Sequence, residues 1–510
     1  MRTRGLLLPA ITLGVCLMGA CTPPQTGEGG EESASEPEMG PAHTREPGQE
    51  LTVIAGAEED MARDMSATLF ENSPIAVLAP AGDVDSQQVA AEVATSLGVP
   101  VLLAPASKED SATGALAEEL DRLGVETLLT IGEAAQAPES GEWETTPLDP
   151  DALELPAEVP SDLHGEPVPD TAALITDSPE NTAATATAEA AGVPTVEVGE
   201  EANLQASSEA IKFLQEQDPA AALADGGEFA DATELDWQVR AARTGYELPG
   251  GGQQIFDSRH YVALYGTPGS TELGVLGHDD LEGTLARVHD LSAEYQDLTK
   301  EEVVPAFEII ATIASDQAGD DGDFSSERSP EQLLPWVERA GEEGMVVILD
   351  LQPGRTDFLT QAKEYEELLK LPHVGLALDP EWRLKPDEEH LRQIGSVSSE
   401  EINEVSEWLA GLVNEEGLPP KMLVLHQFRT SMITDREDVE VSHPEVEVLI
   451  HADGQGSQSE KQATWRALHV DAPEGVAWGW KNFYEKDSPM LTPEQTLSEV
   501  DPLPEVITYQ

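Results

Sequence analysis

Eight short apolar runs in the second half of the chain each end in polar, mostly catalysis-capable residues, and helix-like segments such as 358–370 separate most of them. Strands that alternate with helices predict a parallel sheet. Eight such units over roughly 250 residues are typical of a (β/α)8 barrel, whose chemistry lies where the strands end. The runs are YVALYG, FEIIATIAS, MVVILDLQPGR, VGLALDPEWR, MLVLHQFR, VLIHADGQG and VAWGWKN, between Tyr261 and Asn482, and VITYQ at 506–510.

The first half of the chain carries a strand–helix–strand pattern that occurs twice. Apolar runs at 74–82 and 98–105 flank an Ala-rich helical segment, and the same order returns with the run at 172–177 and the segment GVPTVEVGE. Pro100 and Pro194 hold equivalent places in the two copies. A recurring pattern of this size predicts one supersecondary unit used more than once. We therefore expect a parallel α/β repeat domain over 51–245, followed by a TIM-barrel-like domain over 256–510.

Motifs within the first copy carry a family resemblance. Gly82-Asp83, the segment 97–103, Leu123-Gly124-Val125 and Ile131-Gly132 stand where the cell wall-binding repeat 2 family has its motifs, and Val193-Pro194 is the best match in the second copy. The region resembles this family, which implies noncovalent attachment to an anionic wall polymer. A face this acidic would need bridging cations for that attachment.

The N-terminal sequence predicts an export signal. Arg2 and Arg4 precede an apolar core at 6–17, and Leu17-Met18-Gly19-Ala20-Cys21 forms a small-residue cleavage site. The segment 1–20 resembles a bacterial lipoprotein signal peptide, which implies cleavage before Cys21, lipidation of its thiol and attachment to the extracellular face of the membrane. Residues 21–50 are rich in Pro, Gly, Glu and Ser, so we expect a disordered acidic tether.

Charge and cysteine content exclude several classes of protein. Asp and Glu number 99 against 27 Lys and Arg, and the net charge of −72 should repel nucleic acid and anionic lipid headgroups. Both cysteines, Cys16 and Cys21, lie at the N-terminus. The folded part therefore has no disulfide, thiolate metal site or cysteine nucleophile.

Two Gly-rich segments mark boundaries. Pro249 and the glycines at 250–252 predict a linker over 246–255 between the two domains. The acidic run 316–326 interrupts the barrel after its second strand, and it could serve as an active-site cover or be a solvated insertion.

Successive side chains of a strand point to opposite faces of the sheet, so the position of a residue within each run predicts whether its side chain enters the barrel mouth. In VGLALDPEW, for example, Gly375, Ala377, Asp379 and Glu381 share the inward parity, whereas the seventh strand is ambiguous because either its tryptophans or Gly479 and Lys481 could face inward. Several carboxylates and two imidazoles in one cavity are more than a core needs, because buried charges are costly unless paired. The predicted catalytic residues are Asp350, Asp379, Glu381, His426 and Asp453, and the predicted substrate-binding residues are Tyr265, Gln352, Arg355, His451, Trp478, Trp480 and Lys481.

Two chemistries fit this set. Asp379 or Glu381, paired with Asp453 or Asp350, would flank a glycosidic bond, with Trp382, Trp478 and Trp480 as a stacking surface for sugar rings. Alternatively, His426, the His451-x-Asp453 motif and Asp350 could hold a divalent metal that activates water. No cofactor or metal is required by the first chemistry. An Asp directly after a strand can also serve only as a helix cap, which is the structural alternative for Asp379.

The second half of the chain also resembles an actinobacterial family of exported proteins of undefined function. The matching strings are LDLQPGRTDFLTQAK, LALDPEWRL, LVLHQFR, IHADGQG and WGWKNFY. This resemblance supports the barrel and its site and supplies no reaction. The sequence therefore leaves three interpretations: a wall-associated polysaccharide hydrolase, a glycan-binding or small-ligand-binding lipoprotein, and a structural wall adaptor.

The lipid anchor is testable through its cysteine. A Cys21→Ala protein should leave the membrane fraction or accumulate unprocessed, because the thiol that would carry the lipid is gone. Fractionation and the apparent mass of the chain measure both outcomes. A variant that is processed and still bound to the membrane would contradict the anchor.

Overall fold

The computed structural model describes residues 39–510, except 106–109, 133–136, 139–140, 151–154, 200–201, 233 and 250. The predicted signal peptide, Cys21 and most of the predicted tether lie outside the described residues. Within the described ranges, no helix is long and apolar enough to cross a membrane.

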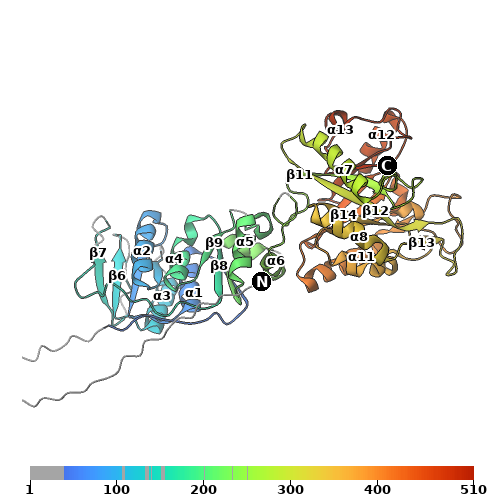
Figure 1. Cartoon of the computed structure of the whole chain (residues 1–510). Coiled ribbons are helices and arrows are strands. Elements are labelled where there is room, and N and C mark those ends of the chain that lie inside the picture. Colours follow the sequence, from blue (N-terminus) through green and yellow to red (C-terminus); the bar gives the residue numbers. More distant parts are fainter. Residues whose placement is uncertain are drawn as a thin grey trace, which may run out of the picture. The chain divides into compact units, whose positions relative to one another are not determined.

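The first half of the chain contains two parallel four-stranded sheets with helices between the strands (Figure 1). The order of the first sheet is β5-β4-β6-β7. Asp83 caps the helix that follows β4 by accepting a hydrogen bond from the amide of Ser86, and Gly98 ends this helix in the left-handed conformation. The elements are β4 (Ile75–Pro80), α2 (Val84–Leu97), β5 (Val101–Ala104), α3 (Asp110–Leu123), β6 (Thr127–Ile131) and β7 (Glu144–Leu148).

The second sheet has the order β2-β10-β8-β9 and repeats the plan of the first, since β8, β9 and β10 stand to one another as β4, β5 and β6 do. The recurrence read from the sequence is therefore present in the fold. The disorder predicted for 21–50 is wrong at its end, because β1 (His43–Thr44) pairs antiparallel with β3 (Phe70–Asn72). The other elements are β2 (Leu51–Ile54), α1 (Glu58–Leu69), β8 (Thr171–Ile175), α4 (Thr182–Ala190), β9 (Thr195–Glu197), α5 (Ser208–Gln217), β10 (Ala221–Asp225) and α6 (Leu235–Arg243).

The second half is a closed barrel of eight parallel strands, as the sequence predicts. Hydrogen bonding between the first and second strands, from Arg259↔Glu302 to Gly266↔Ile309, closes the circle. Each strand contains or overlaps one of the eight predicted runs. In order around the barrel they are β11 (Arg259–Gly266), β12 (Glu302–Ala314), β14 (Val346–Leu351), β15 (Val374–Leu378), β17 (Lys421–Gln427), β19 (Val446–Ala452), β20 (Ala477–Asn482) and β21 (Val506–Tyr509).

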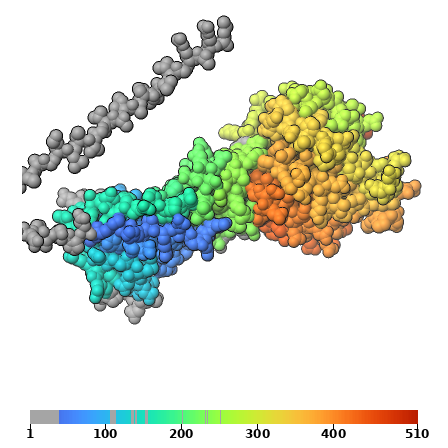
Figure 2. All heavy atoms as spheres, turned by 60° about the horizontal axis from the view of Figure 1, so that its bottom comes forward, coloured from blue at the N-terminus to red at the C-terminus, as the bar shows by residue number. Residues whose placement is uncertain are grey.

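Helices lie outside these strands (Figure 1), and the atoms of the barrel form one closely packed body (Figure 2). The outward residues of the strands, such as Phe307, Leu349 and Leu376, pack with the helices in one large apolar core. The helices are α7 (Leu281–Gln296), α8 (Pro330–Glu342), α9 (Phe358–Glu364), α10 (Glu366–Leu369), α11 (Ser399–Glu416), α12 (Gln458–Leu468) and α13 (Pro493–Glu499).

The residues of opposite parity fill the inside of the barrel. A second apolar cluster contains inward residues from every strand, and it includes Ile348, Ala377, Val424 and Leu449. The predicted inward parity is therefore confirmed for these strands. Toward the carboxyl ends the same parity continues into polar side chains, which form the site described below.

The ambiguity of the seventh strand is resolved in favour of Gly479 and Lys481. A Cβ atom at Gly479 would lie 2.4 Å from Cδ2 of His451, so this position faces the crowded interior and has room only for glycine. Trp478 and Trp480 point the other way and pack against Trp465 of α12, with ring centroids 5.7 and 5.6 Å away.

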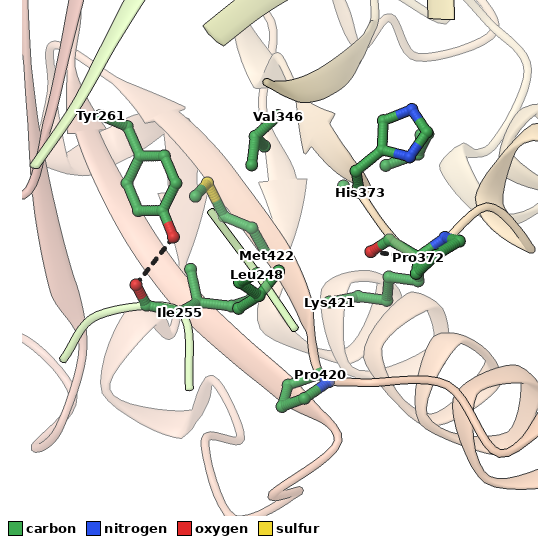
Figure 3. A pocket seen from close by; sticks show the side chains of 11 residues that line it. Leu248, Ile255, Tyr261, Val346, Pro372, His373, Pro420, Lys421 and Met422 are labelled. Atoms are coloured by element: carbon green, nitrogen blue, oxygen red, sulfur yellow. Dashed lines mark hydrogen bonds between the residues drawn. The ribbon is translucent and has the colours of Figure 1, made fainter. Parts of the chain in front are cut away.

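The predicted linker closes the bottom of the barrel. Leu248 and Ile255 are 4% exposed and line, with Tyr261 and Met422, a small apolar pocket at the amino ends of the strands (Figure 3). Tyr261 donates a hydrogen bond to the carbonyl of Ile255 over 2.8 Å. The described part of the segment is thus packed against the barrel.

The acidic insertion is held to the barrel rim. It leads into β13 (Ser325–Glu327), which pairs antiparallel with the end of β12 and was not predicted. The amide of Arg355 donates to the carbonyl of Asp323 over 2.7 Å, and Ser325 Oγ donates to the carbonyl of Gln352 over 3.0 Å.

A substitution at Gly479 tests the packing of the barrel interior. Gly479→Ala should lower the free energy of unfolding by about 1–3 kcal/mol, because the added methyl group collides with His451. Gly411→Ala is the matched control, since no atom lies within 4 Å of its Cβ in α11, and alanine there should stabilise by about 0.5–1 kcal/mol. Chemical denaturation measures both, and equal effects would contradict the inward assignment.

Candidate active site

The site is centred on the imidazole of His426, which is fully buried near the end of β17. Its Nε2 atom lies 2.6 Å from Oε1 of Glu308 and 3.8 Å from Oδ1 of Asp350, and its Nδ1 atom lies 3.2 Å from Oδ2 of Asp453. Burial alone would lower the pKa of His426, but Glu308, Asp453 and Asp350 outweigh burial and raise it well above the usual value. We therefore treat His426 as an imidazolium.

A tyrosine and a glutamine fix one of these carboxylates. Tyr265 OH donates to Oδ2 of Asp350 over 2.7 Å, and Gln352 Nε2 donates to Tyr265 OH over 3.2 Å. Gln352 is held in turn, because its Oε1 accepts from the amide of Ala314 over 3.0 Å. Burial raises the pKa of Asp350 to about 6, although His426 opposes this shift.

The inward lysine of β20 lies over the same tyrosine. Lys481 Nζ is 3.3 Å from the centroid of the Tyr265 ring, which is the geometry of a cation–π contact. Lys481 is 2% exposed. This contact places a positive charge between the first and seventh strands, facing the carboxylates.

The second imidazole is neutral. The His451 ring centroid lies 5.0 Å from that of His426, and its Nε2 is 3.1 Å from Thr508 Oγ1. Burial lowers the pKa of His451 well below the usual value, and the nearby His426 and Lys481 add to the shift. Two adjacent histidines thus carry different charges, because only His426 contacts carboxylates directly.

Three carboxyl groups at the strand ends have pKa values that their surroundings push apart. Burial, reinforced by Asp350, raises the pKa of Asp379 well above the usual value, and burial together with Asp453 raises that of Glu381 to about 7. Burial also raises the pKa of Asp453, but its hydrogen bond to His426 outweighs this and holds the pKa below the usual value. Such a split separates a proton donor from an ionised carboxylate.

Asp379 also has the structural role that the sequence left open. Its Oδ1 accepts from the amide of Glu381 over 3.3 Å and caps the short 3-10 helix η5 (Pro380–Trp382). The cap fixes the turn that carries Glu381, which is half-buried and lies next to the solvent. Asp379 therefore positions Glu381 in addition to contributing a carboxyl group.

Four buried polar atoms of the site have no hydrogen-bond partner among the described residues. Two belong to the carboxylates that face Nε2 of His426, one belongs to the carboxylate that faces its Nδ1, and one belongs to the second imidazole. Buried polar atoms are normally paired, so these atoms can receive groups of a bound molecule or water. They are Glu308 Oε2, Asp350 Oδ1, Asp453 Oδ1 and His451 Nδ1.

The structure does not bring every predicted residue into the site. Trp478 and Trp480 lie outside the barrel against α12, so their predicted role as sugar-stacking platforms is wrong. Arg355 lies at the rim, where its guanidinium stands over the Phe324 ring at 4.4 Å and donates to the carbonyl of Glu388 over 2.8 Å. Trp382 is beside the ring of His390, at 5.3 Å, on the same rim.

Sequence reasoning missed Glu308 and Thr508. Glu308 is fully buried in β12 and makes the shortest contact with His426. Its signal was a lone carboxylate within the apolar run FEIIATIAS, and Val304 and Ala306 of the same parity face the interior. Thr508 lies two residues after the inward Val506 on β21. The alternation rule, applied to the second and eighth strands, identifies both.

The donor set does not favour the metal-dependent alternative. In the described ranges, no group of three or more His, Cys, Asp and Glu side chains is arranged to hold a metal ion. Here the imidazolium of His426 occupies the position between the carboxylates. The arrangement is suited to holding and moving protons.

In comparisons with known proteins, no protein-family model and no curated protein matches this chain.

The pKa of Glu381 predicts a measurable titration. Because the folded chain keeps a proton on Glu381 up to about pH 7, whereas the unfolded chain loses it near pH 4.5, the free energy of unfolding should fall as the pH rises through this window. Glu381→Gln should reduce this fall and remove one carboxyl band that titrates near pH 7 in the infrared spectrum. Glu389→Gln, an exposed acid of the same loop, should change neither, and an unchanged titration in Glu381→Gln would contradict the assignment.

Proposed function

We propose that the chain is a cell-surface lipoprotein, anchored through Cys21 and associated with the cell wall, whose barrel hydrolyses a polysaccharide. The observation that carries the proposal is the convergence of Glu308 on β12, Asp350 on β14 and Asp453 directly after β19 on one imidazolium at the mouth. Asp379 and Glu381 act electrostatically on the same cluster. In a (β/α)8 barrel, this is the end at which catalysis takes place.

Glu381 is the proton donor of the proposed mechanism. It is half-buried, it is carried on the capped turn after β15, and its raised pKa keeps it protonated near neutral pH. It would protonate the glycosidic oxygen as the bond to the leaving sugar breaks. Asp379 holds this turn in place through its hydrogen bond to the amide of Glu381.

Asp453 is the ionised partner. His426 donates to its Oδ2, so the carboxylate stays charged and its other oxygen, Oδ1, remains unpartnered. This oxygen would either attack the anomeric carbon or take a proton from an attacking water. Glu308 and Asp350, on the far side of His426, keep the imidazole charged and oriented.

A non-cleaving glycan receptor is the second candidate, and a specific observation favours it. The Asp453 side chain is only 8% exposed, and Asp379 is 3% exposed. Carboxylates this enclosed could hold sugar hydroxyls through hydrogen bonds without a reaction. Wall attachment through the first domain would then deliver a binding module to the surface.

A glycan screen separates the two candidates. Residues 41–510, which form one compact unit, should release reducing ends from at least one cell-wall or storage polysaccharide, with or without chelator. Glu381→Gln and Asp453→Asn should each lower the rate at least 100-fold, which is the usual scale for a general acid or base, while Glu389→Gln retains it. Activity should decline above about pH 7, as Glu381 loses its proton. Binding of a glycan by the parent protein without release of reducing ends would favour the receptor.

A further inference from the structure

The second sheet of the first domain has a topological switch point. From β8 the chain crosses to β9 on one side, and it then returns to β10 on the other side of β8. Parallel sheets bind ligands at the carboxyl ends of the two strands at such a point. Here those ends are occupied by Thr176, directly after β8, and by Asp225, the last residue of β10.

An asparagine at this point has an amide oxygen without a partner. Asn181 Nδ2 donates to the carbonyl and Oγ1 of Thr176 over 3.1 and 2.7 Å, and it lies 3.3 Å from the carbonyl of Asp225. Because all three neighbours of the nitrogen are acceptors, the orientation of the amide is fixed. Its Oδ1 therefore points elsewhere, has no hydrogen-bond partner, and belongs to a residue that is 2% exposed.

The aspartate beside it has a free oxygen as well. Thr185 Oγ1 donates to Oδ2 of Asp225 over 2.9 Å, but Oδ1 has no partner and the residue is fully buried. Asn181 and Thr185 are four residues apart, so they occupy one face at the start of α4 and both meet Asp225. Two acceptor atoms with no donor call for a cation or a hydrogen-bond donor.

The loop after β10 supplies a second carboxylate, and its backbone at Gly226 approaches the side chain of Thr176 closely. Gly226 has φ +149°, and a Cβ there would lie 2.3 Å from Thr176 Oγ1. Glu228 is exposed, and its Oε2 accepts from Thr176 Oγ1 over 3.0 Å. The switch point therefore has a carboxylate that opens to solvent, in addition to the buried carboxyl of Asp225.

We propose that this switch point binds one divalent cation of the Ca²⁺ type through Asp225 Oδ1, Asn181 Oδ1 and the carboxylate of Glu228. These donors are oxygens, which hard cations prefer, and the set contains no nitrogen or sulfur ligand of the kind that selects softer metals. Two carboxylates offset the charge of the ion. Water fills the other coordination positions, since the site opens at Glu228.

The first repeat offers an internal comparison. Gln87 Nε2 donates to the carbonyl of Pro80 over 3.2 Å and to Glu58 Oε2 over 2.8 Å, and its Oε1 has no partner. The arrangement resembles that of Asn181, but the strand equivalent to β10 ends in Ile131-Gly132 in place of Asp225-Gly226. Glu58 is the carboxylate beside Gln87 at the first switch point, but no carboxyl group is buried at the strand end there as Asp225 is, so we assign the cation to the second repeat.

Proton competition follows from the burial of Asp225. Burial raises its pKa to about 7, so the carboxyl group holds a proton near neutral pH when no cation is bound. Cation binding has to displace that proton. Affinity for Ca²⁺ should therefore increase between pH 6 and pH 8 and level off above that.

Calorimetric titration of residues 41–510 with CaCl₂ in 0.15 M KCl tests the site. We expect one site above the weak background of surface carboxylates, with proton release at pH 6.5 that buffers of different ionisation enthalpy reveal. Asp225→Asn and Glu228→Gln should each weaken this site at least tenfold. Glu197→Gln removes an exposed acid at the same edge of the sheet and should leave it unchanged.

The variants also define the results that overturn the proposal. Equal binding by the parent chain and Glu228→Gln, or a folded Asp225→Asn that keeps the site, would exclude it. A folded Asp225→Asn that is more stable than the parent and binds Ca²⁺ equally would identify Asp225 as a buried acid with no ligand. If Asp225→Asn does not fold, the exposed Glu228→Gln decides the matter, because Glu228 has no part in the core.

Discussion

The ion cluster around His426 is the interaction on which the barrel mouth depends. An imidazolium and several carboxylates lie inside a closed sheet, where each would be unstable alone because burial penalises charge. They are stable together because Glu308 contacts one ring nitrogen and Asp453 the other. The cluster joins strands that are far apart in sequence, since β12, β14, β17 and the loop after β19 each contribute one member.

The cluster also sets the protonation of its surroundings. Positive charge on His426 keeps Asp453 ionised and helps to keep His451 neutral. Burial, together with the charge of Asp453, raises the pKa of Glu381 to about 7 and keeps it protonated below that pH. One buried imidazolium thereby produces the difference between a proton donor and an ionised carboxylate that the proposed hydrolysis requires. The same difference would give a receptor both donors and acceptors for sugar hydroxyls.

Both halves of the chain follow one rule of parallel sheets. Residues just beyond the carboxyl ends of the strands take no part in the hydrogen bonding of the sheet, so their side chains can bind ligands or take part in catalysis. In the barrel this edge is a closed ring, so the side chains converge on one centre. In the repeat domain it is an open edge, so a site arises only where the strand order reverses, between β8 and β10.

The sequence by itself determined the eight strands, the repeat of the first domain and most of the cluster, because alternation is local: Asp350, His426 and Asp453 each end an apolar run at inward parity. It did not decide the seventh strand, since tryptophan suits either a sugar platform or the cover of a helix. Only the tertiary structure decided this, because a Cβ atom at Gly479 would lie 2.4 Å from the His451 ring, so only glycine fits inward there and Trp478 and Trp480 face outward. It likewise decided that Glu308 contacts His426, since that pair is 118 residues apart and closes across the barrel.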